Sequence, residues 1–213
     1  MKFCIIGLGR FGYQVATGLA ENGMEVLAID SSETIIASIR DLVTHAICMR
    51  VIDETSLTNI GVQEMDTVVV ATGEDFAQTI LITALLKKRL HIKHVIARAI
   101  NDIHREILYL TGADEVVLPE REIGIRLAGT LSHPFTELLQ LNNRFSISQI
   151  KAPDAFVGKT IQKLALYKTY QVHCIAVKLA EEIVSVSPEY QVQKDDILLL
   201  SGNNKDLEKM ARL

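Results

Sequence analysis

The feature that most constrains the fold is a glycine turn near the start of the chain, Gly7-Leu8-Gly9-Arg10-Phe11-Gly12. An apolar run, Phe3–Ile6, precedes this turn, and an amphipathic segment at 11–22 follows it. In such a strand–turn–helix unit the first glycine allows the tight turn, the second lets a pyrophosphate approach the backbone, and the third allows close packing of helix on strand. The motif therefore predicts a Rossmann-type unit that binds a nucleotide.

Apolar runs and amphipathic segments alternate over the first two thirds of the chain. The runs are nearly continuous in Val, Ile, Leu and Ala, which is typical of strands buried on both faces. Six βα units in a row predict a doubly wound parallel sheet with helices on both faces. The predicted strands are Phe3–Ile6, Val26–Ile29, Ala46–Met49, Thr67–Ala71, His94–Ala97 and Glu115–Leu118, and the predicted helices are 11–22, 32–42, 54–61, 76–90, 102–111 and 120–132.

The pattern changes after residue 131. Pro134 and the apolar stretch Phe135–Leu141 lead to Asn142-Asn143, which predicts a helical connector over 133–143. Turns then come at shorter intervals, as expected of a small α+β domain over 144–213. The fold class is therefore α/β, with a Rossmann-like domain over 1–132 and a small C-terminal α+β domain. In the second domain the predicted strands are Phe145–Ile150, Val172–Val177, Ile183–Val186 and Ile197–Leu200, and the predicted helices are Thr160–Leu166 and Asn204–Ala211.

The composition excludes several classes of protein. A net charge of −4 argues against a nucleic-acid binder, which would normally carry a basic face. No apolar run reaches the roughly 20 residues that cross a bilayer, so we expect a cytosolic protein. The three cysteines lie in separate apolar segments and fit neither a disulfide framework nor a zinc site, so we expect them to be reduced and buried.

Asp30 ends the second predicted strand about 20 residues after the turn, where an acid accepts hydrogen bonds from ribose hydroxyls. Ser31 and Ser32 follow it, so the 2′-phosphate of NADPH would meet no cation there and would be repelled by Asp30. The sequence of the turn fits NAD and an adenine mononucleotide such as ATP equally well, because both present a ribose and phosphates to it. Arg10 is predicted to pair with a phosphate, because its charge would otherwise oppose the helix dipole.

A set of short motifs along the whole chain carries a family resemblance. They are Gly-Leu-Gly-Arg-Phe-Gly, Thr44-His45-Ala46, Gly112-Ala113-Asp114, Leu118-Pro119-Glu120, Gly158-Lys159, Ile175-Ala176-Val177-Lys178, Pro188, Asp195-Asp196-Ile197-Leu198 and Gly202. Together they resemble the RCK-domain regulatory subunits of Ktr and Trk potassium transporters (KtrA/TrkA-like). The resemblance covers essentially the whole chain.

This resemblance implies a regulatory subunit and no enzyme. Such subunits form homodimers that assemble into an octameric ring on the cytosolic face of a KtrB/TrkH-like membrane potassium-translocating subunit. They bind ATP or ADP, or in some relatives NAD(H), and nucleotide exchange changes the shape of the ring and gates the pore. A divalent cation, Mg²⁺ or Ca²⁺, accompanies ATP.

The resemblance also implies which positions form the nucleotide site. The glycines of the turn hold phosphates, and Arg10 reaches the nucleotide of a neighbouring subunit. Residues 71–73 border the adenine, Arg98 lies near the nucleotide, and Glu120 binds the divalent cation. The full set is Gly7, Gly9, Arg10, Phe11, Gly12, Asp30, Ser31, Arg50, Ala71, Thr72, Gly73, Arg98 and Glu120.

Two positions depart from the family pattern. Arg50-Val51 stand where relatives often have a small or amide residue and then an acid or alanine, so Arg50 adds a charge beside the adenosine or changes nucleotide preference. Tyr167 stands where many relatives have the arginine that precedes the tyrosine of a cyclic di-AMP site, while Tyr170 is retained. This change argues against cyclic di-AMP as a ligand.

The alternative function is an NAD-dependent oxidoreductase with a reduced substrate domain. Beyond the glycine turn, no His, Lys or Tyr stands in a recognisable proton-transfer arrangement with a carboxylate.

Two of the expected site residues also have simpler interpretations. Glu120 fits a favourable acid at a helix start, and Arg98 fits a surface charge.

Overall fold

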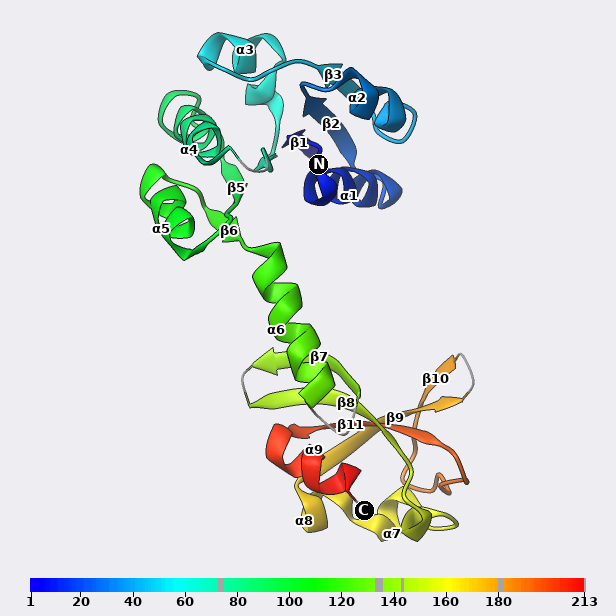
Figure 1. Cartoon of the computed structure of the whole chain (residues 1–213). Coiled ribbons are helices and arrows are strands. Elements are labelled where there is room, and N and C mark those ends of the chain that lie inside the picture. The colour runs from blue at the N-terminus through cyan, green and yellow to red at the C-terminus, as the bar shows by residue number, and fades with distance from the viewer. Residues whose placement is uncertain (73–74, 133–135, 143, 180–181, 213) are drawn as a thin grey trace. The chain divides into compact units, whose positions relative to one another are not determined.

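The computed structural model describes residues 1–72, 75–132, 136–142, 144–179 and 182–212 (Figure 1). The chain divides into two compact units, Met1–Glu122 and Ile123–Leu213, each with its own sheet. The division falls inside helix α6 (Pro119–Ser132), whereas the sequence predicted it at the end of that helix. None of the helices in these ranges is long and apolar enough to span a bilayer.

The first unit is a six-stranded, fully parallel sheet in the order β3-β2-β1-β4-β5-β6. The doubly wound α/β fold predicted from the sequence is confirmed. The switch in strand order lies between β1 and β4, which is where such sheets bind ligands. The strands are β1 (Lys2–Ile6), β2 (Glu25–Asp30), β3 (His45–Cys48), β4 (Thr67–Val70), β5 (His94–Arg98) and β6 (Glu115–Val117). The helices are α1 (Arg10–Glu21), α2 (Glu33–Ile39), α3 (Glu54–Asn59), η1 (Val62–Glu64), α4 (Phe76–Ala84), η2 (Leu85–Arg89) and α5 (Asp102–Thr111).

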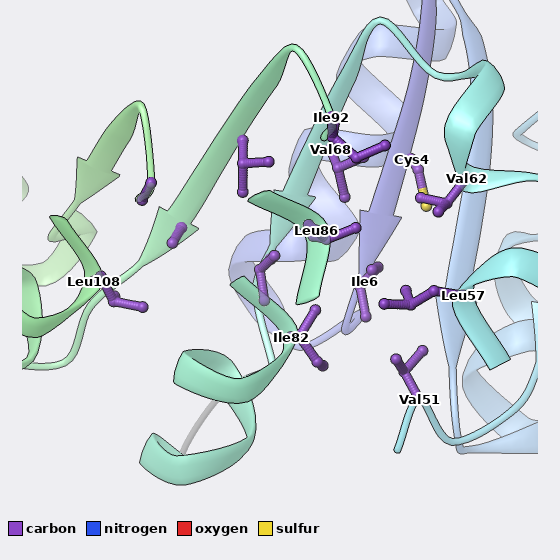
Figure 2. Packing of buried hydrophobic residues seen from close by; sticks show 14 of the residues in the cluster. Cys4, Ile6, Val51, Leu57, Val62, Val68, Ile82, Leu86, Ile92 and Leu108 are labelled. Carbon is purple, nitrogen blue, oxygen red and sulfur yellow. The ribbon is translucent and has the colours of Figure 1, made fainter. Parts of the chain in front are cut away.

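Two apolar clusters cover the two faces of this sheet, because side chains alternate along each strand. On β1, Cys4 and Ile6 join the cluster that also contains Leu57 of α3 and Ile82 of α4 (Figure 2). Ile5 faces the other cluster, which includes residues of α1 and α2. Helices therefore cover both faces, as predicted.

The cysteines differ in exposure. Cys4 is fully buried, and burial raises the pKa of its thiol. Cys174 is half-buried, but Cys48 is exposed at the end of the edge strand β3. The expectation that all three are buried is therefore wrong for Cys48, because an edge strand has no neighbour on its outer side.

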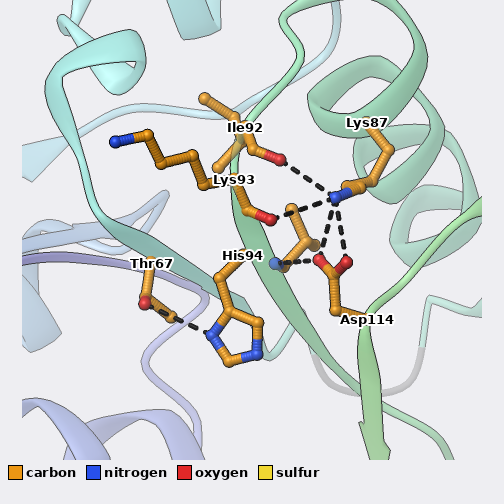
Figure 3. Close-up of polar contacts among 7 residues, drawn as sticks. Thr67, Lys87, Ile92, Lys93, His94 and Asp114 are labelled. Atoms are coloured by element: carbon orange, nitrogen blue, oxygen red, sulfur yellow. Dashed lines mark hydrogen bonds and ion pairs between the residues drawn. The ribbon is translucent and has the colours of Figure 1, made fainter.

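A polar cluster ties η2, β5 and β6 together (Figure 3). Lys87 Nζ donates to the carbonyls of Ile92 (3.0 Å) and Lys93 (3.3 Å) and to both carboxylate oxygens of Asp114 (2.9 and 3.0 Å). The Val95 N–H also donates to Asp114, at 2.7 Å. Burial opposes ionisation of this carboxyl, but Lys87 and the Val95 N–H outweigh it and lower the pKa of Asp114.

The second unit is a five-stranded antiparallel sheet in the order β10-β9-β11-β8-β7, with short helices, as predicted for a small α+β domain. An apolar cluster that includes Leu198, Leu200 and Leu207 forms its core. The strands are β7 (Thr136–Asn142), β8 (Phe145–Lys151), β9 (Val172–Leu179), β10 (Glu182–Ser185) and β11 (Ile197–Asn203). The helices are η3 (Asp154–Phe156), α7 (Ile161–Leu164), α8 (Leu166–Tyr170) and α9 (Asn204–Ala211).

The predicted helical connector is wrong over Thr136–Asn142, which forms strand β7 against β8. The register shifts twice along this pair, between Glu137 and Leu139 and between Gln140 and Asn142. Such bulges break the strict alternation that marks a strand in a sequence, so this segment shows no period of two. Residues 133–135 and 143 lie outside the described ranges.

Candidate functional site

A cavity of about 240 Å³ lies at the carboxyl ends of β1, β2 and β4. Its walls come from the glycine turn, the end of β2, the segment after β3, the end of β4 and helix α4. Ligands of open α/β sheets bind at this edge, beside the switch in strand order. The lining residues are Ile6, Gly7, Gly9, Ile29, Asp30, Ser31, Ile35, Met49, Arg50, Val51, Ala71, Thr72 and Gln78.

Two glycines of the turn are required by the packing of the protein itself. Gly7 has φ 92°, in the left-handed region that favours glycine, and a Cβ there would lie 2.7 Å from the backbone of Ala71. A Cβ on Gly12 would lie 1.9 Å from the carbonyl oxygen of Gly7. These two positions therefore hold α1 close to the ends of β1 and β4.

Gly9 is different, because a Cβ there would meet no protein atom within 4 Å. Gly9 lines the cavity and is the N-cap of α1, and no side chain caps this end of the helix. The first N–H groups of a helix have no partner within the helix, and with the dipole they favour an anion. The space over Gly9 thus suits a phosphate group.

Asp30 connects three parts of the site. Its Oδ2 accepts a hydrogen bond from the Leu8 N–H at 2.7 Å, and its Oδ1 accepts one from the Ser32 N–H at 2.8 Å. The carboxylate is therefore fixed between the glycine turn and the start of α2, and it lines the cavity. A carboxylate has about four acceptor sites, so Asp30 can still accept from two adjacent hydroxyl groups.

The far wall of the cavity is formed after β3 and by α4. Arg50 is exposed there, and Val51 is buried beside it. The side-chain amide of Gln78 reaches across from α4 and its Nε2 donates to the Val51 carbonyl at 3.0 Å. This contact joins the two segments that close the wall.

The structure brings most of the predicted site residues together at the cavity. Those that line it are Gly7, Gly9, Asp30, Ser31, Arg50, Ala71 and Thr72. Sequence reasoning missed six lining residues, namely Ile6, Ile29, Ile35, Met49, Val51 and Gln78. Ile6 and Ile29 directly precede the predicted residues Gly7 and Asp30. Met49 and Val51 flank Arg50 in the chain, which was a usable signal, but nothing in the sequence marked Ile35 or Gln78. Gly73 lies outside the described residues.

Arg10 and Phe11 do not line the cavity. Phe11 packs on the apolar cluster beneath α1 and α2. Arg10 is the exposed first residue of α1, and its side chain has no hydrogen-bond or ion-pair partner in the part of the chain that the structure describes. The first turn of α1 contains no acidic residue. The guanidinium charge therefore stands unpaired at the positive end of a helix dipole.

Arg98 and Glu120 contact each other, and neither lines the cavity. Arg98 Nη2 donates to Glu120 Oε1 at 2.6 Å, and Arg98 Nε is buried with no partner among the described residues. The backbone N–H of Glu120 and then Arg98 lower the pKa of this exposed carboxyl. In the described ranges no three His, Cys, Asp or Glu side chains gather as a metal site would need. A cation role for Glu120 stays a prediction.

Comparison with known proteins gives matches along nearly the whole chain. Residues 3–119 match the TrkA-N domain model and residues 146–213 match the TrkA-C domain model. The chain is 33% identical over 214 residues to the "Ktr system potassium uptake protein C" of Bacillus subtilis (strain 168), which covers 99% of this chain and 96% of that protein.

Two solved structures share the fold. One is titled "GsuK channel bound to NAD", with a TM-score of 0.58 at 22% identity over 99% of this chain and 38% of that chain. The other is titled "Shewanella denitrificans Kef CTD in AMP bound form", with a TM-score of 0.54 at 21% identity over 62% of this chain and 82% of that chain. This chain therefore spans well under half of the GsuK channel chain.

Proposed function

Because this chain belongs to the family of RCK-domain regulatory proteins of Ktr and Trk potassium uptake, we propose that it senses a nucleotide and gates a membrane potassium-translocating subunit. The observation that carries the proposal is the cavity at the carboxyl edge of the sheet. Open space over Gly9 at the start of α1 provides a place for phosphates, and Asp30 provides acceptors for a ribose on the same cavity. A phosphate site and a ribose site on one cavity suit a nucleotide.

The ligand that we propose is ATP or ADP, with NADH as the second candidate. Both classes present a ribose and phosphates to Asp30 and the glycine turn. The two solved structures with this fold are described as bound to NAD and to AMP, which supports a nucleotide as the ligand. NADPH is not expected, because its 2′-phosphate would lie against the Asp30 carboxylate.

The proposed switch depends on contacts that differ between ATP and ADP. A ligand shifts a two-state assembly only by its differential affinity for the two states. The unpaired Arg10 guanidinium would contact the terminal phosphate bound by a neighbouring subunit of the ring. Glu120 would hold a divalent cation with ATP through Oε2, the oxygen that Arg98 does not contact in this structure. The subunit would work as homodimers in an octameric ring on the cytosolic face of a KtrB/TrkH-like partner, without catalysing a reaction.

The experiment is a comparison of four nucleotides on the purified chain. ATP, ADP, NADH and NADPH are each titrated while thermal unfolding is followed, and hydride transfer to or from the dinucleotides is assayed in parallel. We expect stabilisation by ADP and ATP, none by NADPH, and no turnover. Potassium flux with the membrane subunit should then depend on whether ATP or ADP is present. Stabilisation by NADPH equal to that by ADP would refute the ribose assignment, and turnover would favour the oxidoreductase.

A further inference from the structure

Gln78 lies where α4 meets the cavity wall. Asp75 caps α4 and accepts the Gln78 N–H at 2.9 Å, which fixes the backbone of Gln78 at the first turns of the helix. From this position the side chain crosses to the segment after β3 and donates to the carbonyl of Val51 at 3.0 Å. Gln78 is half-buried and lines the cavity, so it is held at both ends beside the proposed ligand.

The contact with Val51 determines which way the amide of Gln78 points. A backbone carbonyl only accepts hydrogen bonds, so the NH₂ group must face Val51 and Oε1 must occupy the other branch of the amide. Across the described ranges, no donor contacts Gln78 Oε1. Val51 is 3% exposed, and its own N–H donates to no acceptor among the described residues. Gln78 and Val51 both line the cavity, so together they provide one acceptor and one donor that no described residue uses.

We propose that Gln78 reads the base of the bound nucleotide and selects adenine. Its Oε1 accepts from the N6 amino group, and the Val51 N–H donates to the neighbouring ring nitrogen. A purine with a carbonyl at C6, such as hypoxanthine or guanine, presents an acceptor to Oε1 and an N–H at N1, which reverses both contacts. This role rests on the proposed function, because it requires a nucleotide in the cavity.

The test compares ADP with IDP, which share the ribose and phosphates and differ in the base at C6. Calorimetric titrations are run on the wild type, on Gln78→Met and on the control Gln14→Met, an exposed glutamine of α1 that does not line the cavity. We expect the wild type to prefer ADP at least tenfold, since a site with polar groups for a hydrogen-bonding substrate rejects analogues that leave them unpaired. Gln78→Met should lower the affinity for ADP about tenfold and change the affinity for IDP by no more than about twofold. Gln14→Met should bind as the wild type does.

The ratio of the two affinities separates recognition from structural support. If Gln78 only positions Val51, the methionine variant loses affinity for ADP and for IDP by the same factor. The ratio of the two affinities then stays constant, and the inference is overturned. A wild type that binds both nucleotides equally also overturns it, but leaves the nucleotide site intact. A wild type that binds neither nucleotide overturns this inference together with the proposal of ADP as a ligand. Unfolding of the free proteins confirms that each variant is folded.

Discussion

Replacement of Gly9 by alanine should abolish nucleotide binding without destabilising the fold. Gly9 has φ −63° and ψ −175°, extended backbone that any residue adopts, and a Cβ there meets no protein atom within 4 Å. The free energy of unfolding should therefore change by less than about 1 kcal/mol, because the stiffer unfolded chain and the weaker N-cap have opposite effects. The same methyl group occupies the space over the start of α1 where phosphates approach the backbone, so nucleotide binding should be lost.

Two other glycines of α1 provide matched controls. A Cβ on Gly18 also meets no atom within 4 Å, and Gly18 does not line the cavity, so Gly18→Ala should bind nucleotide normally. Gly12→Ala, unlike Gly9→Ala, should destabilise the fold. Its Cβ would lie 1.9 Å from the Gly7 carbonyl oxygen, so the helix must move, at about 1–3 kcal/mol of stability.

The assay is thermal unfolding with and without ADP at 100 times its dissociation constant. Binding at that concentration adds about 2.7 kcal/mol, which corresponds to a rise in Tm of roughly 5–11 °C for a chain of this size. The wild type and Gly18→Ala should show the full rise, and Gly9→Ala should show none while its ligand-free Tm is unchanged. A Gly9→Ala protein that binds ADP with wild-type affinity would refute the assignment of phosphates to this turn.

Three further changes test the charged groups. Arg10→Ala should keep ADP affinity within a few fold but lose roughly ten- to hundred-fold of any ATP preference, since an ion-paired hydrogen bond contributes about 1.5–3 kcal/mol. A parallel fall for ATP and ADP in the titration would make Arg10 a general anchor. Glu120→Gln should weaken the effect of Mg²⁺ or Ca²⁺ on ATP binding and spare ADP, whereas equal loss with both nucleotides would indicate only its structural pairing with Arg98. Asp114→Asn should lower the free energy of unfolding by about 1 kcal/mol at neutral pH, because the carboxylate that pairs with Lys87 is partly exposed and screened. The pKa of Asp114 is lowered on folding, so its stabilisation is present above the ordinary value of about 3.9 and is lost as the pH falls through the folded value. Urea unfolding of wild type and variant at pH 7 and below pH 4 should show this difference shrinking, and a constant difference would contradict it.

The parallel sheet was predictable because each of its strands is a short apolar run between turn signals. Most observed bounds agree with the prediction to a residue or so, as in β2 at Glu25–Asp30 and β5 at His94–Arg98. Strand β7 was missed because its two register shifts remove the period of two. The change from α4 to the π-helical turn Leu85–Arg89 was missed as well, because no Gly or Pro marks it.

The site was predictable where it is made of strand ends. Asp30 ends β2, and Ser31 and Thr72 come just after parallel strands. Because the carboxyl ends of these strands meet at one edge, the positions of the three residues in the sequence predict their positions in space. Gln78 reaches the same cavity from a helix that the sequence presented mainly as an amphipathic segment. Its contact with Val51 depends on how α4 packs, and no local pattern encodes that.

The two backbone hydrogen bonds of Asp30 determine which experiment tests the ribose contact. Replacing Asp30 removes the acceptors of the Leu8 and Ser32 N–H groups, at 2.7 and 2.8 Å, and so disturbs the glycine turn and the start of α2 together with any ribose contact. Loss of nucleotide binding in such a variant would follow from either cause. Comparison of NADH with NADPH on the wild-type chain changes only the 2′ position of the ligand and leaves both hydrogen bonds in place. Discrimination against NADPH therefore measures how the intact site, with the Asp30 carboxylate in place, excludes a 2′-phosphate.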